Sequence, residues 1–244
     1  MATREALGYL VRIMRSRYRD NSTVLAELRR HIRRGDVVCD IGAHQGSLLY
    51  WLARWAKPGR VIAFEPQPDL AAALSRLCIR FSLGNVVIER TAVDISSGVR
   101  DLFVPDGRPG GSLLRPQGTF KGTVNPIEVQ TVSLDDYLTA HERVSAVRID
   151  VAGAELDVLL GAERTLSRCM PLLIVNCDRH LTSTERMQET FALLSDLGYS
   201  GSFVSRGQLL PLSGFNPDVH QKNDNEGFWT QKGYCNDFVF RKAG

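Results

Sequence analysis

The stretch "VVCDIGAHQGSLLYWLARWA", residues 37–56, decides the fold. Its first five residues form a short apolar run rich in β-prone side chains, and its last ten place apolar residues at helical spacing. Gly42 and Gly46 lie in the turn between these two patterns. A strand, a glycine turn and a helix in this order predict the first unit of an α/β fold that holds a nucleotide-like ligand.

The same alternation continues along the chain. Strand-like and helical patterns follow one another at residues 60–65, 68–81, 85–93, 145–151, 154–168, 171–177 and 183–198, and a last strand, "DFVFRK", occupies residues 237–242. Near-continuous apolar strands separated by helices are typical of a parallel sheet covered on both faces. We therefore predict one doubly wound α/β domain over residues 35–244, with a mostly parallel sheet and its ligand at the carboxyl ends of the strands.

Length and composition limit the classes of protein that fit. A chain of 244 residues suits one large α/β domain, and a net charge of +3 gives no reason to expect a nucleic-acid partner. The sequence shows neither an apolar run of the ~20 residues that a spanning helix needs nor a signal peptide. Five scattered cysteines without a C-x-x-C pair indicate free thiols, so we expect a cytoplasmic protein. The oligomeric state is left open.

Residues 1–34 are strongly basic, with nine arginines, no lysine and three acidic residues. Two apolar series recur there at helical spacing: Leu7, Leu10, Val11 and Met14, then Leu25, Leu28 and Ile32. One interpretation is a helical cap that packs these residues on the domain and leaves the arginines in solvent. The other is a surface that attracts an acidic substrate or makes peripheral contact with an anionic membrane.

The acidic residue before the glycine turn narrows the choice of ligand. A dinucleotide fingerprint needs a third glycine and a site that favours pyrophosphate, and Asp40 opposes that charge. A nicotinamide-dependent oxidoreductase is therefore disfavoured. S-adenosylmethionine has no phosphate and carries a positive sulfonium and an ammonium group, so Asp40 would favour it. Gly42 and Gly46 are expected to let the backbone and the next helix approach this cofactor.

Glu65 ends the second strand, 25 residues after Asp40. A carboxylate at this place can accept both ribose hydroxyls, although Glu65 could instead cap a helix beginning at Pro66. Asp94 either meets the adenine edge or is a turn residue. The predicted cofactor site comprises Asp40, Gly42, Ala43, His44, Gly46, Ser47, Glu65, Pro66, Ala92, Val93, Asp94 and Asp150.

Several blocks together resemble a known family. "VCDIGAHQG", "GRVIAFEPQP", "NVVIERTAVDISSG", "TVSLDDYL" and "RIDVAGAELDVLLGAE" are similar in order and spacing to the signature blocks of FkbM-type S-adenosylmethionine-dependent methyltransferases, over about residues 36–178. The resemblance implies a class I methyltransferase fold, with a seven-stranded sheet whose last strand is antiparallel. It also implies O-methylation of a sugar hydroxyl on a glycolipid or lipo-oligosaccharide, or of a polyketide product.

The chain departs from the family pattern at two places. It reads "DVAGAE" at residues 150–155, with Ala152 where the family usually has glutamate, and it has Asn176 and Asp178 where the family tends to show Glu-x-His. These departures leave a third hypothesis open. The chain could be a methyltransferase-like module that binds without catalysing transfer.

Methyl transfer to a hydroxyl needs in-line alignment and removal of the hydroxyl proton. Asp150 ends the strand predicted at 145–151, beside the expected methyl position, or else caps the next helix. His180 is the candidate general base by its ordinary pKa. Asp150, Asn176 and Asp178 could alternatively form an oxygen-rich Mg²⁺ site that acidifies a bound hydroxyl.

Two long segments, 98–134 and 213–236, interrupt the alternation and are predicted to cover the acceptor. Ser112 and Arg115 in the first, and Trp229 in the second, are candidate substrate contacts. The alternatives are a mobile loop for the first pair and core packing for the tryptophan.

Overall fold

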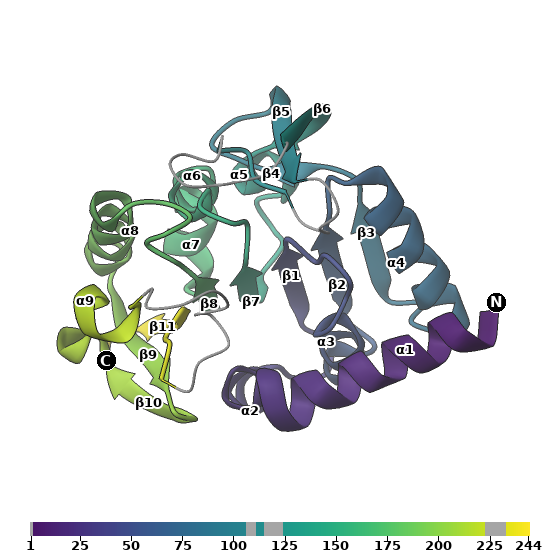
Figure 1. Ribbon diagram of the computed structural model, residues 1–244, viewed down its shortest axis with the longest axis horizontal. Helices are drawn as coiled ribbons and strands as arrows, with labels where there is room; N and C mark the ends of the chain where they lie inside the picture. Colours follow the sequence, from purple (N-terminus) through teal and green to yellow (C-terminus); the bar gives the residue numbers. More distant parts are fainter. Residues whose placement is uncertain (1, 106–110, 115–123, 223–232) are drawn as a thin grey trace.

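A twisted eight-stranded sheet forms the centre of the protein in the computed structural model, which describes residues 2–105, 111–114, 124–222 and 233–244 (Figure 1). The strand order is β10-β9-β11-β8-β7-β1-β2-β3. The strands are β1 (Val37–Ile41), β2 (Arg60–Phe64), β3 (Val86–Glu89), β7 (Val144–Ile149), β8 (Leu172–Asn176), β9 (Tyr199–Ser205), β10 (Gln208–Pro211) and β11 (Asp237–Lys242). The doubly wound fold class is therefore confirmed.

Strands β3, β2, β1, β7 and β8 pair in parallel, and β11 runs antiparallel to both β8 and β9. The antiparallel last strand expected from the family resemblance is thus present. The eighth strand, β10, is an addition to the seven expected. It forms a hairpin with β9 through Arg206 and Gly207, whose positive φ values of 48° and 80° suit a tight two-residue turn.

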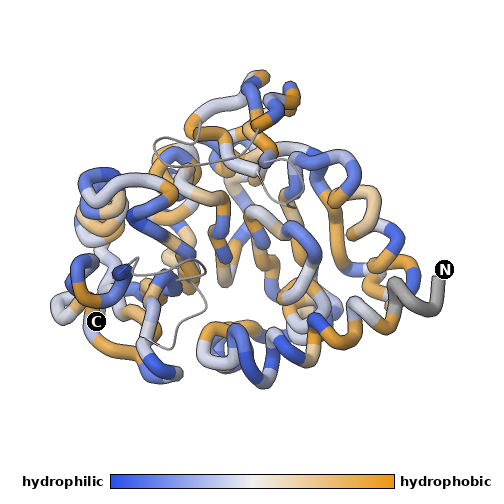
Figure 2. Tube along the Cα trace, in the orientation of Figure 1, coloured by the Kyte–Doolittle hydropathy of each residue, from blue (hydrophilic) through white to orange (hydrophobic). Residues whose placement is uncertain are grey.

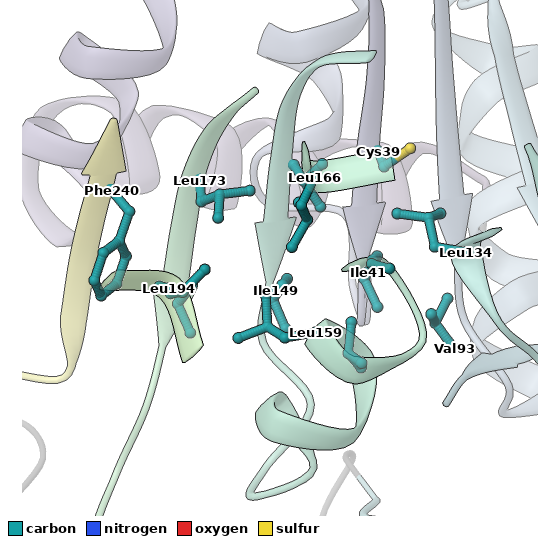
Figure 3. Packing of buried hydrophobic residues seen from close by; sticks show 14 of the residues in the cluster. Cys39, Ile41, Val93, Leu134, Ile149, Leu159, Leu166, Leu173, Leu194 and Phe240 are labelled. Atoms are coloured by element: carbon teal, nitrogen blue, oxygen red, sulfur yellow. The ribbon is translucent and has the colours of Figure 1, made fainter. Parts of the chain in front are cut away.

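Helices cover both faces of the sheet, and successive side chains along each strand point to opposite faces. Cys39, Ile41, Ile149 and Leu173 point into one apolar cluster with Leu134, Leu159, Leu166 and Leu194, several of which Figure 3 shows side by side. Their neighbours in the strands, Val38, Ala146 and Ile174, pack on the other face with Leu28, Leu52 and Leu74. This period of two is the physical reason that the strands read as continuous apolar runs.

Helices are present where the sequence predicts them at 47–56, 68–81 and 183–198, whereas the short helices at Leu134–Tyr137 and Pro217–His220 are not predicted. The helices include α2 (Ser22–His31), α3 (Leu49–Ala56), α4 (Pro68–Arg80), α5 (Leu134–Tyr137), α6 (Glu155–Leu160), α7 (Glu163–Cys169), α8 (Thr184–Asp196) and α9 (Pro217–His220), with a 3-10 turn at Leu212–Gly214. The single helix expected over 154–168 is two helices, α6 and α7. They separate at Gly161, where a Cβ would lie 2.1 Å from the Asp94 carbonyl oxygen, so another segment crosses the break.

The strand predicted over residues 85–93 is also divided. Its first part is β3, and its second part is β4 (Ala92–Val93), which pairs with β6 (Val124–Val132) in a separate sheet. Strand β5 (Gly98–Pro105) completes this sheet of order β4-β6-β5, which lies at the top of Figure 1. The strand-like pieces that the sequence suggests within 98–134 therefore form a second layer beyond the carboxyl end of β3.

The N-terminal helix packs by a different face from the one expected. Helix α1 (Ala2–Arg15) continues into a π-helical turn at Ser16–Asp20 before α2. From Leu7 onward, its buried apolar residues are Tyr9 and Ile13, whereas Leu7, Leu10, Val11 and Met14 are exposed. The expectation that this apolar series covers the domain is therefore wrong for α1. It is correct for α2, whose Leu25 and Leu28 are fully buried together with Ile32.

Two further expectations concern the whole chain. Across the described residues, none of the helices combines the length and the apolar character that a bilayer span requires. The five cysteines are free thiols, three of them buried. Burial raises the pKa of the Cys39 thiol to about 12, which makes this group inert as a nucleophile at neutral pH.

Candidate functional site

The turn after β1 is held closed by its own hydrogen bonds. The N–H groups of Gly42 and Ala43 both donate to the Phe64 carbonyl oxygen at 3.0 Å. The next N–H, of His44, donates to Glu65 Oε2 at 2.7 Å. A phosphate-binding turn directs successive N–H groups at its ligand. Here three of them are satisfied by the second strand, so the turn offers no such cradle.

The two glycines of the turn are required for a reason that the sequence does not reveal. Gly42 has φ +80°, and a Cβ on it would lie 2.0 Å from the Asp150 carbonyl oxygen. Gly46 has φ +70°, and a Cβ there would lie 2.7 Å from Leu74 Cδ2. The sequence predicts that both glycines make room for a ligand. In the structure, a Cβ at either position would point at protein atoms, so the glycines permit a left-handed backbone and close packing of the turn.

Glu65 is a buried carboxylate that joins the first two β–α units. Its side chain is 3% exposed, and its oxygens accept the N–H groups of His44 and, at 3.0 Å, Gln67. Burial raises the pKa of Glu65, and these N–H groups act in the opposite direction. Helix α4 begins two residues after Pro66, at Pro68, so Glu65 does not cap a helix that begins at Pro66. Each carboxylate oxygen can accept a further hydrogen bond, as ribose hydroxyls require.

Asp40 does not present its charge to an open site. It is 1% exposed, and its Oδ1 accepts a hydrogen bond of 3.1 Å from Arg148, its neighbour across β1 and β7. The same guanidinium donates to the Gly42 carbonyl oxygen at 2.8 Å and pairs with Asp150. Burial raises the pKa of Asp40, while Arg148 opposes that rise. The prediction that Asp40 directly attracts a cationic ligand is therefore wrong, because the positive charge of Arg148 already balances this carboxylate.

The polar cluster continues across the carboxyl ends of the strands. Asn176, at the end of β8, donates from Nδ2 to Asp237 Oδ1 at 3.0 Å, and Asp237 begins the antiparallel strand β11. Burial raises the pKa of Asp237, and both Asp150 and Arg148 lie near enough to influence it. Because Ile149 pairs with Val175, Asp150 and Asn176 come next at the ends of neighbouring strands.

Sequence reasoning missed two members of this cluster, Arg148 and Asp237. A signal for the first was available. Arg148 is a charged residue within a buried apolar strand, two positions before Asp150 and hence on the same face. No comparable signal marks Asp237, because only the pairing of β11 with β8 places it there.

Asp178 and His180 form a separate group with the C-terminal segment. Asp178 is buried, and its two oxygens accept the His180 N–H at 2.9 Å and the Tyr234 hydroxyl at 2.7 Å. The His180 ring Nε2 lies 2.9 Å from the Gln221 carbonyl oxygen. Because a carbonyl only accepts, Nε2 carries a proton and is not the nitrogen that could act as a base.

The donor set does not fit the Mg²⁺ site considered from the sequence. Asp150 is paired with the Arg148 guanidinium, whose positive charge repels a cation, and Asp178 belongs to the separate group with His180 and Tyr234. Within the part of the chain that the structure describes, no three His, Cys, Asp or Glu side chains gather as metal ligands. We therefore derive no step through a metal ion.

Asp94 follows β4 and is buried like Ala92 and Val93. Its Oδ2 accepts a hydrogen bond of 2.7 Å from Arg100, whereas Oδ1 is buried without a partner among the described residues. Asp94 directly precedes the bend at residues 95–97, as the turn interpretation expects, but it is buried rather than solvated. An unsatisfied buried oxygen is suited to a ligand donor such as the amino group of adenine.

The remaining candidates have varied surroundings. Ser112 donates from Oγ to the Ala152 carbonyl oxygen at 2.7 Å and accepts the Leu114 N–H, so it fastens its loop to the end of β7. Ser47 and Pro66 are half-buried next to the first two turns. Arg115 and Trp229 lie outside the described residues.

Glu155 is a buried acid at the start of α6. Its Oε1 accepts the Gly153 N–H at 2.9 Å, while Oε2 has no partner among the described residues. Burial is the main cause that raises the pKa of Glu155 from 4.5 to about 7.

A Glu155→Gln substitution is expected to change the pH dependence of stability. The folded state binds the proton more tightly, so this stabilisation is complete below about pH 4.5 and is lost as the pH rises through about 7. The shift corresponds to at most about 3 kcal/mol. In urea unfolding, the free energy of unfolding of the variant minus that of the wild type should be larger at alkaline pH than at pH 4.5. A difference that is constant with pH would contradict the burial argument.

Comparisons with known proteins agree with this geometry. The methyltransferase FkbM domain profile matches residues 40–200. The chain is 32% identical to the 31-O-demethyl-FK506 methyltransferase FkbM of Streptomyces tacrolimicus, over 54% of this chain and 61% of the relative. It is 30% identical to the hexuronic acid methyltransferase AglP of Haloferax volcanii, over 61% of this chain and 59% of the relative. The chain spans about 60% of the length of the curated relatives it matches.

Solved structures share the fold at low sequence identity. A methyltransferase FkbM from Methylobacillus flagellatus superposes with a TM-score of 0.53 at 17% identity, over 85% of this chain and 43% of the other. A Streptococcus mutans protein described as a methyltransferase and solved with S-adenosylhomocysteine superposes with a TM-score of 0.55 at 11% identity. The match covers 92% of this chain and 98% of the other. The chain belongs to the methyltransferase FkbM domain family and has the class I fold of S-adenosylmethionine-dependent methyltransferases.

Proposed function

We propose that this chain is an S-adenosylmethionine-dependent O-methyltransferase that acts on a sugar hydroxyl of a glycolipid or lipo-oligosaccharide. The observation that carries the proposal is the closed turn after β1, whose N–H groups at Gly42, Ala43 and His44 bond to Phe64 and Glu65. Such a turn disfavours a phosphate and is compatible with a phosphate-free adenosyl compound. That compound, when bound, supplies an electrophilic methyl group.

The roles of individual residues follow from their positions. Glu65 would accept the ribose hydroxyls, and Asp94 Oδ1 would accept from the adenine amino group. The backbone between Gly42 and Gly46 would lie along the amino-acid part. Asp40 acts indirectly, since Arg148 connects it to the Gly42 carbonyl oxygen and keeps the turn in place.

The acceptor would approach the carboxyl ends of β7 and β8. Asp150 is half-buried there and contacts Arg148, and its carboxylate would orient the acceptor hydroxyl and accept its proton. The name of one relative, a 2-O-methyltransferase from Sinorhizobium fredii, supports transfer to oxygen, and that of another, a hexuronic acid methyltransferase, supports a sugar acceptor. A polyketide acceptor, as for the FK506 relative, is the alternative within this class.

Calorimetric titration with S-adenosylhomocysteine tests the cofactor part. The wild type should bind it, and Glu65→Gln should weaken binding at least tenfold, because the amide accepts less strongly and faces two N–H donors. Glu89→Gln is the matched control. Glu89 ends the neighbouring strand β3 and bonds to the Tyr137 hydroxyl, outside the proposed contacts. Equal losses in both variants, or no binding by the wild type, would refute the assignment.

A binding module without transfer remains the second candidate. It is favoured by the hydrogen bonds that tie both Asp178 oxygens to protein donors and direct the proton of His180 Nε2 to a carbonyl. Mass spectrometry of extracted glycolipids separates the two functions. An enzyme adds the mass of one methylene group per methyl transferred, whereas a module that only binds leaves the acceptor mass unchanged even with the cofactor bound.

A further inference from the structure

One face of α1 is apolar and exposed. Its residues recur at i, i+3, i+4 and i+7, which is the spacing of a single helical stripe. We name them the α1 stripe: Leu7 (62% exposed), Leu10 (42%), Val11 (51%) and Met14 (51%). Tyr18, 71% exposed in the following π-helical turn, lies one helical turn further along. Monomeric soluble proteins seldom expose apolar side chains so close together, so the stripe needs an explanation.

Folding of the domain does not explain the stripe, because α1 is attached by its opposite face. Tyr9 is fully buried, donates from its hydroxyl to the Gly46 carbonyl oxygen at 3.1 Å, and packs against Phe81. Ile13 is buried too, and its carbonyl oxygen accepts from the Trp51 indole at 3.2 Å. These contacts hold α1 along the side of α3 and α4, where Figure 2 shows apolar and polar segments alternating along its length.

The charge beside the stripe is positive. Residues 7–20 contain Arg12, Arg15, Arg17 and Arg19 and one acid, Asp20, while Arg4 and Glu5 earlier in α1 cancel in charge. Arg12 and Arg17 lie over the rings of Tyr9 and Trp51, whereas Arg15 and Arg19 extend into solvent. Arg15 and Arg19 are more than half exposed even while they contact Asp20. An exposed apolar stripe beside arginines is the combination that binds the surface of an anionic bilayer, with the apolar side chains among the acyl chains and the cations at the headgroups. An acidic protein partner would use the arginines but leave the stripe unexplained.

We infer that α1 is a membrane-surface helix that docks this protein on an anionic lipid bilayer. The helix lies in the plane of the interface, and the α1 stripe enters the boundary between headgroups and acyl chains. This inference is independent of the proposed transferase activity. It would also bring the turn at Gly46, which Tyr9 contacts, close to the bilayer.

Sedimentation with vesicles tests the inference. The wild type should pellet with vesicles of phosphatidylcholine and phosphatidylglycerol in equal parts, less with phosphatidylcholine alone, and less as salt is raised. A Val11→Glu, Met14→Glu double variant should lose at least about tenfold in partitioning, because two buried apolar side chains are replaced by anions. Both sites are exposed in the protein alone, so the variant should keep the wild-type thermal midpoint.

Val219→Glu is the matched control, since Val219 is a similarly exposed apolar residue on α9, which lies away from α1 (Figure 1). This variant should bind vesicles like the wild type. Three results would overturn the inference: no binding by the wild type to anionic vesicles at low salt, equal binding by the double variant, or a wild-type dimer that the double variant converts to monomer. The last would show that a second copy covers the stripe.

Discussion

Gly42→Ala should lower the free energy of unfolding by about 2–5 kcal/mol and abolish binding of S-adenosylhomocysteine. Two costs combine at this position. An alanine at φ +80° costs about 1–2 kcal/mol for left-handed backbone. Its Cβ would also lie 2.0 Å from the Asp150 carbonyl oxygen, and overpacking of this kind costs about 1–3 kcal/mol. The turn must shift to relieve the contact, which displaces the proposed cofactor contacts.

Two other glycines separate these costs. Gly35 has φ +95°, and no atom lies within 4 Å of the position that a Cβ would take, so Gly35→Ala carries the conformational cost alone. Gly84 has open space and an ordinary φ, so Gly84→Ala should be nearly neutral, within about 0.5 kcal/mol. Chemical denaturation and titration with the ligand would measure all three. If Gly42→Ala costs no more than Gly35→Ala and still binds the ligand, the close approach of Asp150 to the turn is wrong.

Arg148→Met should destabilise the protein by about 3–5 kcal/mol, because it leaves a buried carboxylate without its partner. Asp40 is 1% exposed, and the guanidinium also donates to the Gly42 carbonyl oxygen. Removal of Arg148 therefore takes a hydrogen-bond donor away from both the Asp40 carboxylate and the Gly42 carbonyl oxygen. The Asp150 carboxylate is half-buried and can be hydrated, so its share of the loss should be small.

A second substitution makes this prediction specific. Asp40→Asn removes the unpaired charge, so the double variant with Arg148→Met should recover a large part of the lost stability. Arg164→Met is the control, since Arg164 is 74% exposed and the Asp135 carboxylate that it contacts keeps the backbone N–H donors of Arg164 and Thr165, so its loss should cost at most about 1 kcal/mol. Similar costs for Arg148→Met and Arg164→Met, or no recovery in the double variant, would contradict the role given to Arg148.

The sheet and its connections could be predicted because apolar periodicity reports them directly. Strands buried on both faces appear as continuous apolar runs, and Gly198 marks the end of α8 with the expected positive φ of 85°. The local sequence pattern does not predict the structure where contacts between distant residues determine it. Gly161 divides a helix only because the Asp94 carbonyl crosses there. The β9–β10 hairpin turns on Arg206 and Gly207, which is not a strong turn pair in sequence.

The candidate site was predictable in position but not in electrostatics. The sequence correctly places Glu65 at the end of β2, beside the turn after β1. It cannot show that Arg148, more than a hundred residues from Asp40, neutralises that carboxylate, because this pairing depends on the register of β1 against β7. Likewise, the spacing of Leu7 and Met14 predicts an amphipathic helix but not which of its faces packs on the domain.

A crystal structure of the protein with saturating S-adenosylhomocysteine tests the central claim most directly. We expect the ribose hydroxyls on the Glu65 carboxylate and the amino-acid part along the backbone between Gly42 and Gly46, with Asp40 still paired to Arg148. Ligand bound elsewhere, or a nucleotide phosphate seated on the N–H groups of that turn, would contradict the account.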